Sequence, residues 1–326
     1  MKKLTSETVL KARSYRSVLS TGLRLYTENF RRLFKASWLL ALIYAVTGGC
    51  LGTLVGIKMP EITVGILQQI AAYEGVSPDT ARQYTVTAAE IFGLVLLAIV
   101  TLGMASATFL DKLKEHKDTG AISMPAHWLK ASPRLIGRTL KGLLSTLLLQ
   151  LLPFLLFAGA LVAVEAASPQ FLLRHSVTLA AMLAVYTVIV LCFALPLMYV
   201  LMKYVMESPC GYWPTLARHY SRGLRHWGSL FNVFFLSTLL VALVSMVIAL
   251  PATILNIANQ QAHLGQLMGD PLGMPSYIAP LTFCTAMLCS FLDFYVSQTT
   301  LIHNYYLYGS IEAKEQEREQ QKNSIQ

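Results

Sequence analysis

The sequence predicts an all-α protein built as a bundle of six transmembrane helices. Hydrophobic residues make up 55% of the 326 residues and charged residues only 13%, whereas a soluble domain normally carries about a quarter charged residues. A helix needs about 20 consecutive apolar residues to cross a hydrocarbon core about 30 Å thick. The chain contains six such segments, at about 36–57, 86–110, 142–164, 177–202, 229–255 and 278–303.

The distribution of cations predicts the topology of these spans. All but three of the 26 Lys and Arg residues lie before the first span, in the second and fourth connections, or after the sixth span. The exceptions are Lys58, Arg82 and Arg174. Because cytoplasmic connections carry an excess of Lys and Arg, we expect both termini in the cytoplasm, which also requires an even number of spans.

The segment before the first span has the pattern of a basic amphipathic helix. Apolar side chains recur at helical spacing from Tyr15 to Phe34. The cations on the other side are Arg24, Arg31, Arg32 and Lys35. Such a helix rests in the headgroup region, where its cations are attracted to anionic lipid. We therefore expect a surface helix that leads into the first span.

The first span carries a small-residue face, and a polar connection follows it. Glycines recur at four-residue steps, which allows a neighbouring helix to approach closely; they are Gly48, Gly52 and Gly56. The apolar spacing between Ile62 and Ile70 predicts a short helix on the outer surface.

The second span is expected to begin outside the bilayer. Ser77-Pro78-Asp79 is a helix-start signal, because Pro is suited to the first helical turn. Glu90 then falls close to the outer interface. Hydration makes a carboxylate inexpensive there, and we assign Glu90 no function.

The basic stripe before a span occurs twice more. After the second span, cations follow one another at steps of four, four and three, namely Lys130, Arg134, Arg138 and Lys141. After the fourth span, the steps are four and three, namely Arg218, Arg222 and Arg225. The sequence thus predicts three units of a basic interfacial helix plus a helical hairpin. All eleven cations of the three stripes are candidate contacts for lipid headgroups.

Asp293 is the one ionisable residue placed deep inside a predicted span. At 1.5 Å per residue it lies on the order of 15 Å from the inner surface, and carboxylates at such depth usually face a polar interior or mark a pathway. Its candidate polar stripe, with Gln150 facing it from the third span, comprises Ser290, Asp293, Ser297, Thr300, Asn304 and Gln150. Two interpretations stay open: a structural hydrogen-bond anchor, or the lining of a hydrated cavity.

The remaining polar residues indicate no catalytic chemistry. The chain lacks His-Glu-x-x-His, Gly-x-Ser-x-Gly and a phosphate-binding Gly-rich loop with Lys. Its seven histidines are scattered, and its five cysteines form no Cys-x-x-Cys pair. We expect no enzyme activity, cofactor, metal or nucleic-acid partner. The segment 309–326 is predicted to be a charged, solvated cytoplasmic tail.

Two motifs resemble a bacterial family. One is the lead Tyr26-x-x-Asn29-Phe30-x-x-Leu33-Phe34-x-x-Ser37-Trp38, and the other is Tyr305-Tyr306-Leu307-Tyr308 at the end of the sixth span. Together they resemble the six-helix membrane domain that precedes some glycerophosphodiester phosphodiesterases, and related stand-alone bacterial membrane proteins. The resemblance implies a bacterial inner-membrane protein. Because the chain leaves no room for a phosphodiesterase domain after the sixth span, we do not expect the hydrolytic activity.

Two classes of function follow from these patterns. The first is a non-enzymatic membrane module that engages anionic lipid or a membrane-protein partner through its basic interfacial helices. The alternative is a small transporter or channel that uses the polar stripe around Asp293. A cavity that converges on Asp293 between the third and sixth spans would favour transport, whereas tight apolar packing there would favour the module.

Overall fold

The described part of the chain is helical almost throughout. The computed structural model describes residues 9–71, 77–123, 133–167, 176–207, 211–268 and 275–325, and no strand occurs among them. The elements are α1 (Tyr15–Thr53), the π-helical turn η1 (Leu54–Lys58), α2 (Met59–Ala71), α3 (Pro78–Thr119), α4 (Pro133–Ala167), α6 (Ser176–Met206), α7 (Tyr212–Arg225), α8 (Trp227–Leu267) and α9 (Ile278–Ile325). Six helical stretches are long and apolar enough to cross a membrane, which confirms the predicted count.

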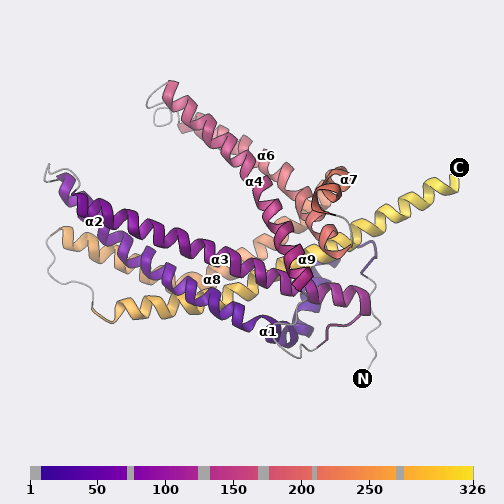
Figure 1. Cartoon of the computed structure of the whole chain (residues 1–326), viewed down its shortest axis with the longest axis horizontal. Coiled ribbons are helices and arrows are strands. Elements are labelled where there is room, and N and C mark those ends of the chain that lie inside the picture. Colours follow the sequence, from indigo (N-terminus) through magenta and orange to yellow (C-terminus); the bar gives the residue numbers. More distant parts are fainter. Residues whose placement is uncertain are drawn as a thin grey trace.

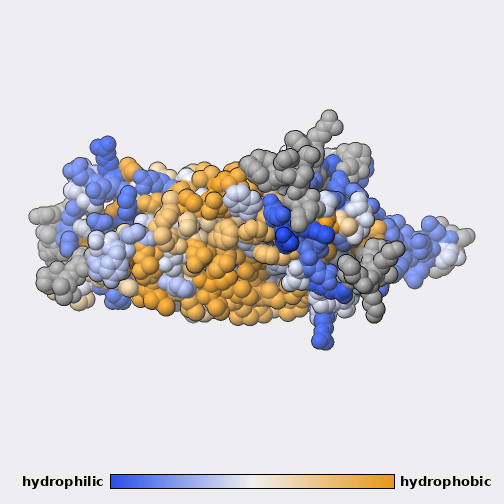
Figure 2. All heavy atoms as spheres, turned by 90° about the horizontal axis from the view of Figure 1, so that it is seen from below, coloured by the Kyte–Doolittle hydropathy of each residue, from blue (hydrophilic) through white to orange (hydrophobic). Residues whose placement is uncertain are grey.

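The helices form two arms that meet at one end (Figure 1). The helices α1, α3, α8 and α9 lie side by side in a long four-helix arm. The helices α4 and α6 pair in a second arm that diverges from the first. We call the end where the arms meet, beside α7, the base, and the opposite end of the four-helix arm the distal end. Figure 2 shows an apolar belt between hydrophilic ends.

The predicted surface helix at the N-terminal side is the start of one continuous helix. The side chain of Ser14 accepts a hydrogen bond from the N–H of Ser17 and so caps α1. From there α1 continues without a break through η1 into α2, so the short outer helix is also a continuation. The apolar face of the lead is buried against the protein at Val18, Leu25 and Leu33. It does not lie free on lipid, because the 48-residue α9 extends along α1.

The three predicted units differ from one another in their helix breaks. In α4 the basic segment and the span also form one helix from Pro133 onward. Within the described ranges, only the third unit has a separate amphipathic helix, α7, which ends where the chain turns at His226 with φ −101° and ψ 20°.

The glycines of α1 bring two helices into close contact. A Cβ atom at Gly48 would lie 2.0 Å from Ser290 Oγ, and one at Gly52 would lie 2.4 Å from the Cβ of Ala286. A Cβ atom at Gly56, in η1, would lie 2.1 Å from Asn256 Oδ1 of α8. Any larger side chain would push the helices apart, so the predicted packing face is confirmed and its neighbours are α9 and α8.

The start of α3 also follows the prediction. Ser77 is the N-cap, its Oγ accepts a hydrogen bond from the N–H of Thr80 at 3.2 Å, and Pro78 occupies the first turn. The helix ends at Gly120, whose φ of 74° requires the left-handed conformation that glycine adopts easily.

The main hydrophobic core lies at the base. Its largest buried side chains come from α3, α6, α7 and α9 and include Phe109, Leu113, Tyr199, Tyr212, Tyr305 and Tyr308. The segment 309–326 is only partly a solvated tail, which differs from the prediction. Ile311, Glu312 and Glu315 are buried, and exposure begins at residue 316. The reason is that α9 continues as a helix beneath α6 and α8 after its apolar span ends.

Candidate functional site

Asp293 belongs to α9, and its side chain contacts α8. The hydroxyl of Ser245 in α8 donates a short hydrogen bond to its Oδ1. The expected facing residue, Gln150, lies on α4, which packs against α3 and α6. The structure thus gives the carboxylate a partner that the sequence reasoning did not name.

The rest of the polar stripe does not converge on Asp293. Ser290 faces α1 at Gly48, and the hydroxyl of Ser297 donates to the carbonyl of Phe294 in its own helix. Thr300 and Asn304 are half-buried further along α9. The stripe therefore divides among the helices that surround α9.

The candidate headgroup cations fall into two groups. Five of them are held by protein partners: Arg24 by Glu28, Arg32 by the Ile122 carbonyl, Arg138 by the Tyr204 and Glu207 carbonyls, Arg222 by Glu319, and Arg225 by Glu315. Like Arg24, Arg32 and Arg225, four others are exposed: Arg31, Lys35, Lys141 and Arg218. Lys130 and the side chain of Arg134 lie outside the described residues.

Arg138 has a structural position at the end of α6. Its Nε and Nη2 atoms donate to the carbonyl of Tyr204 at 2.9 and 2.6 Å, and Nη2 also donates to the carbonyl of Glu207 at 2.8 Å. Its guanidinium lies 4.3 Å from the centre of the Tyr204 ring. A cation in this position satisfies carbonyls that the helix end leaves without partners.

A buried ion network joins the two arms at the base. Lys203 Nζ in α6 lies 2.7 Å from Glu312 Oε1 in α9 and 3.2 Å from Glu207 Oε2. The Tyr199 hydroxyl donates to Glu312, and the Tyr308 hydroxyl donates to Glu207. Lys203 and Glu312 are only 5% and 6% exposed. Sequence reasoning missed this base network because it placed Lys203 in a connection and Glu312 in a tail.

Several titratable groups of the base have shifted pKa values, among them Glu207 and His219. Burial alone would raise the pKa of Glu207, but the Tyr308 hydrogen bond and the Lys203 ammonium lower it below the ordinary value of 4.5. Burial lowers the pKa of His219 in α7 below 6.5, and the charges of Lys203 and Arg222 lower it further. Both effects favour the neutral imidazole of His219, and its Nδ1 is buried with no hydrogen-bond partner among the described residues.

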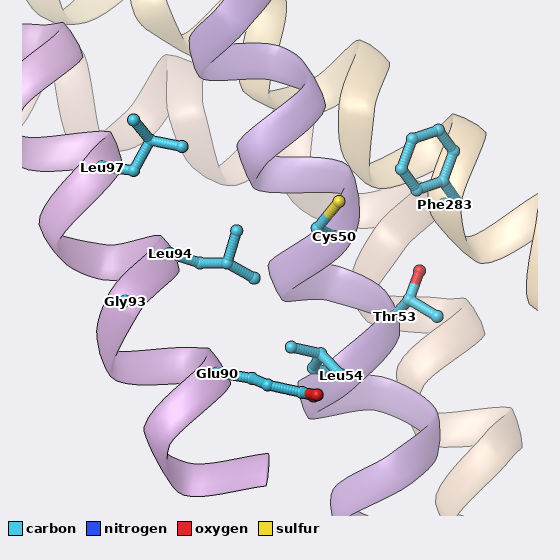
Figure 3. Close-up of a pocket in the computed structure, with 8 residues that line it drawn as sticks. All are labelled: Cys50, Thr53, Leu54, Glu90, Gly93, Leu94, Leu97 and Phe283. Atoms are coloured by element: carbon cyan, nitrogen blue, oxygen red, sulfur yellow. The ribbon is translucent and has the colours of Figure 1, made fainter. Parts of the chain in front are cut away.

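A pocket of about 620 Å³ opens between α1 and α3 towards the distal end (Figure 3). Its lining is Cys50, Thr53, Leu54, Glu90, Gly93, Leu94, Leu97 and Phe283. In Figure 3 the side chains of Glu90 and Leu94 point from α3 towards α1. Gly93 leaves space, since a Cβ atom there would have nothing within 4 Å. We call this hollow the distal pocket; its size lies within the range of about 300–1,000 Å³ that ligand pockets occupy.

A second hollow of about 290 Å³ adjoins the distal pocket. Its lining is Lys58, Glu61, Ile62, Arg82, Gln83, Val86 and Thr87, and we call it the charged recess. Lys58 Nζ lies 3.7 Å from Glu90 Oε2, so this ion pair connects the recess to the pocket. The Lys58 and Glu90 side chains are 53% and 45% exposed, and such exposed pairs contribute little to stability.

The sequence carries a signal for this site in the placement of its cations. Lys58 and Arg82 are two of the three cations that break the charge asymmetry of the chain, yet Glu90 was set aside as a hydrated carboxylate. An apolar hollow next to paired charges suits an amphiphile that places an acyl chain in the hollow and a polar head beside it. Within the described ranges, no group of three or more His, Cys, Asp or Glu residues is arranged to hold a metal ion.

The helices and these hollows define the class: an α-helical, multi-pass membrane protein. No protein-family model, curated protein or solved structure matches the chain. The resemblance to the phosphodiesterase membrane domain therefore stays a prediction. Residues of its first motif pack between α1 and α9, where the Tyr26 hydroxyl donates to the Tyr295 carbonyl at 2.9 Å and the Phe34 ring stacks on Tyr295 at 5.3 Å.

Proposed function

We propose that this protein resides in a bacterial inner membrane with both termini and the base in the cytoplasm. The support is the distribution of Lys and Arg, which leaves Lys58 and Arg82 as the distal exceptions among the described residues. The same distribution and the recurring basic stripes support a chain built from three related units. The continuous α1 and α4 then represent units in which the interfacial helix and the span have merged.

We infer that the protein is a non-enzymatic membrane module that engages anionic lipid on its cytoplasmic side. The observation that carries this inference is the exposed set of Arg31, Lys35, Lys141 and Arg218 at the base. Each cation near an anionic membrane surface contributes about 1 kcal/mol of attraction. These four side chains stand at the base end of the apolar belt, where headgroups would lie.

The test compares two variants with the same loss of charge. Arg31→Gln/Lys35→Gln removes cations beside the belt, and Arg318→Gln/Lys322→Gln removes exposed cations from the protruding end of α9. The measurement is the rise in unfolding temperature when phosphatidylglycerol is added to the full chain in a neutral detergent.

The wild type and the tail variant should be stabilised by the lipid, and the stabilisation should shrink in high salt because salt screens exposed charges. The Arg31/Lys35 variant should lose a large part of it. Equal stabilisation of both variants would show that the exposed cations at the base do not engage anionic lipid.

The alternative, a small transporter or channel, depends on Asp293. One observation keeps it open: a carboxylate lies at the depth of a span and is not fully buried. The hydrogen bond from Ser245 favours an anchoring role instead. If Asp293→Asn leaves both the level of folded protein and the phenotype of expressing cells unchanged, the transport alternative is wrong.

A further inference from the structure

The distal end is poor in cations, yet two of them share one recess. Of the three Lys and Arg residues on this side of the chain, Lys58 and Arg82 both line the charged recess. The third, Arg174, lies outside the described residues. Topology alone disfavours cations on this side, so their meeting beside an apolar hollow needs a separate explanation.

The two hollows together have the shape and chemistry of an amphiphile site. Apart from Glu90 and the hydroxyl of Thr53, the lining of the distal pocket is apolar, and the pocket opens on the apolar surface at Leu97, which is 45% exposed. Glu90 stands at the boundary with the charged recess through its contact with Lys58. A chain in the pocket would thus continue into a head in the recess.

We propose that this site binds one phospholipid with a primary-amine headgroup, with an acyl chain in the distal pocket. The phosphate lies between Lys58 and Arg82, and the ammonium lies by Glu61 and Glu90. The proposal rests on the proposed function as a lipid-engaging module and extends it to a specific lipid at the opposite end of the protein.

The balance of charge selects this headgroup. Two cations and two carboxylates surround the site, so a zwitterionic head meets an opposite charge at each of its own charges. An anionic lipid such as phosphatidylglycerol would leave Glu61 and Glu90 beside its phosphate without a cation of the ligand. Phosphatidylcholine has no N–H donor to offer the carboxylates, whereas a primary ammonium has three.

The existing ion pair does not obstruct the ligand. Lys58 Nζ and Glu90 Oε2 are 3.7 Å apart and both side chains are about half exposed. Exposed pairs of this kind are held weakly. The phosphate and ammonium of the lipid would replace each partner by a group of the same charge, so no charge is left without a counterpart.

The experiment fills the pocket without disturbing the helix packing. Gly93→Leu places a side chain into open space, and a leucine is a better helix former than glycine. Gly159→Leu in α4 is the matched control, because this glycine is also exposed with nothing within 4 Å of a Cβ atom. The full chain in detergent is titrated with phosphatidylethanolamine, phosphatidylglycerol or phosphatidylcholine of identical chains, and bound lipid is counted by native mass spectrometry.

We expect the wild type and Gly159→Leu to retain one phosphatidylethanolamine at this site; phosphatidylglycerol held by the cations of the base is recognised as the binding that Gly93→Leu leaves unchanged. Gly93→Leu should weaken this binding about tenfold, which corresponds to about 1.4 kcal/mol, and Lys58→Gln/Arg82→Gln should weaken it similarly without filling the pocket. Unchanged phosphatidylethanolamine binding by Gly93→Leu, or phosphatidylglycerol binding that Gly93→Leu weakens equally, would overturn the proposal.

The outcome is separable from the test of the proposed function. That test concerns phosphatidylglycerol and Arg31/Lys35 at the base, and the present one concerns phosphatidylethanolamine and Gly93 at the distal end. Loss of the anionic-lipid effect with intact phosphatidylethanolamine binding would refute only the proposed function. Loss of phosphatidylethanolamine binding with an intact anionic-lipid effect would refute only the distal lipid site.

Discussion

Replacing Lys203 by Met removes the cation that connects the two arms at the base. Its ammonium lies 2.7 Å from Glu312 on the neighbouring arm, and their side chains are only 6% and 8% exposed. Removing one partner of a buried pair costs about 3–5 kcal/mol, because a buried charge is left without compensation. Glu312 keeps the hydrogen bond from Tyr199, so we expect a loss of about 3 kcal/mol, at the lower end of that range.

A second substitution should recover most of this loss. In Lys203→Met/Glu312→Gln neither member of the buried pair is charged, and the amide oxygen of Gln can still accept the hydrogen bond from Tyr199. Replacement of a buried ion pair by neutral groups is often close to neutral for stability. We expect the double variant to lie within about 1 kcal/mol of the wild type.

The assay is reversible unfolding of the full chain in mild detergent by titration with a denaturing detergent, followed by far-ultraviolet circular dichroism. Lys141→Met is the control, because Lys141 is exposed on α4 and surface substitutions usually change stability by less than about 0.5 kcal/mol. The reasoning fails if Lys203→Met resembles this control, or if the double variant is as unstable as the single one.

Two further predictions concern pH and helix packing. Stability should decrease in two steps on acidification: below about pH 6.5, because the folded state resists protonation of His219, and again below about pH 4.5, where protonation of Glu207 is favoured in the unfolded chain. A pH series of unfolding temperatures should show that His219→Asn weakens the first step, to which the lowered pKa of His116 also contributes, and that Glu207→Gln weakens the second; a flat profile in the wild type contradicts both assignments. Gly48→Leu should lower stability by about 1–3 kcal/mol or more through overpacking against Ser290. Gly65→Leu is the control and should not lower stability, because a side chain there enters open space. Equal unfolding temperatures of the two variants would mean that α1 and α9 are not in close contact.

The spans and helix contacts with a local signature could be predicted from the sequence. Each apolar run falls inside a helix because a membrane span depends on its own composition. The glycine face of α1 was also legible, since close helix approach needs small residues at four-residue steps. Ser77-Pro78 marks the start of α3 because a helix cap depends on neighbouring residues. The Ser77 side chain binds an N–H of the first turn, which Pro78 begins.

Features that depend on distant partners could not be predicted in this way. Glu312 and Glu315 occupy a charged segment that is indistinguishable from a solvated tail by composition. They are buried because the fold brings their cationic partners to them. Lys203 of α6 pairs with Glu312, and Arg225 and His226 at the end of α7 pair with Glu315. The divergence of the α4–α6 arm has no local signal either. Because Gln150 lies on α4, its separation from Asp293 could not be predicted from the sequence.

Lys58 and Lys203 show why a charge must be placed in three dimensions before its role is assigned. Both follow directly after a predicted span and both pair with a glutamate of another helix. The Lys203–Glu312 pair is 2.7 Å long and almost fully buried, so its charges are committed to joining the arms. The Lys58–Glu90 pair is 3.7 Å long and about half exposed. It stands beside an apolar pocket that no side chain of the described residues fills. A charge in a buried ion pair stabilises the contact between helices. A charge in an exposed, weakly held ion pair at the edge of a pocket can bind a ligand instead. By this criterion the distal pocket and its charged recess are a better candidate ligand site than Asp293, whose carboxylate accepts a hydrogen bond from Ser245.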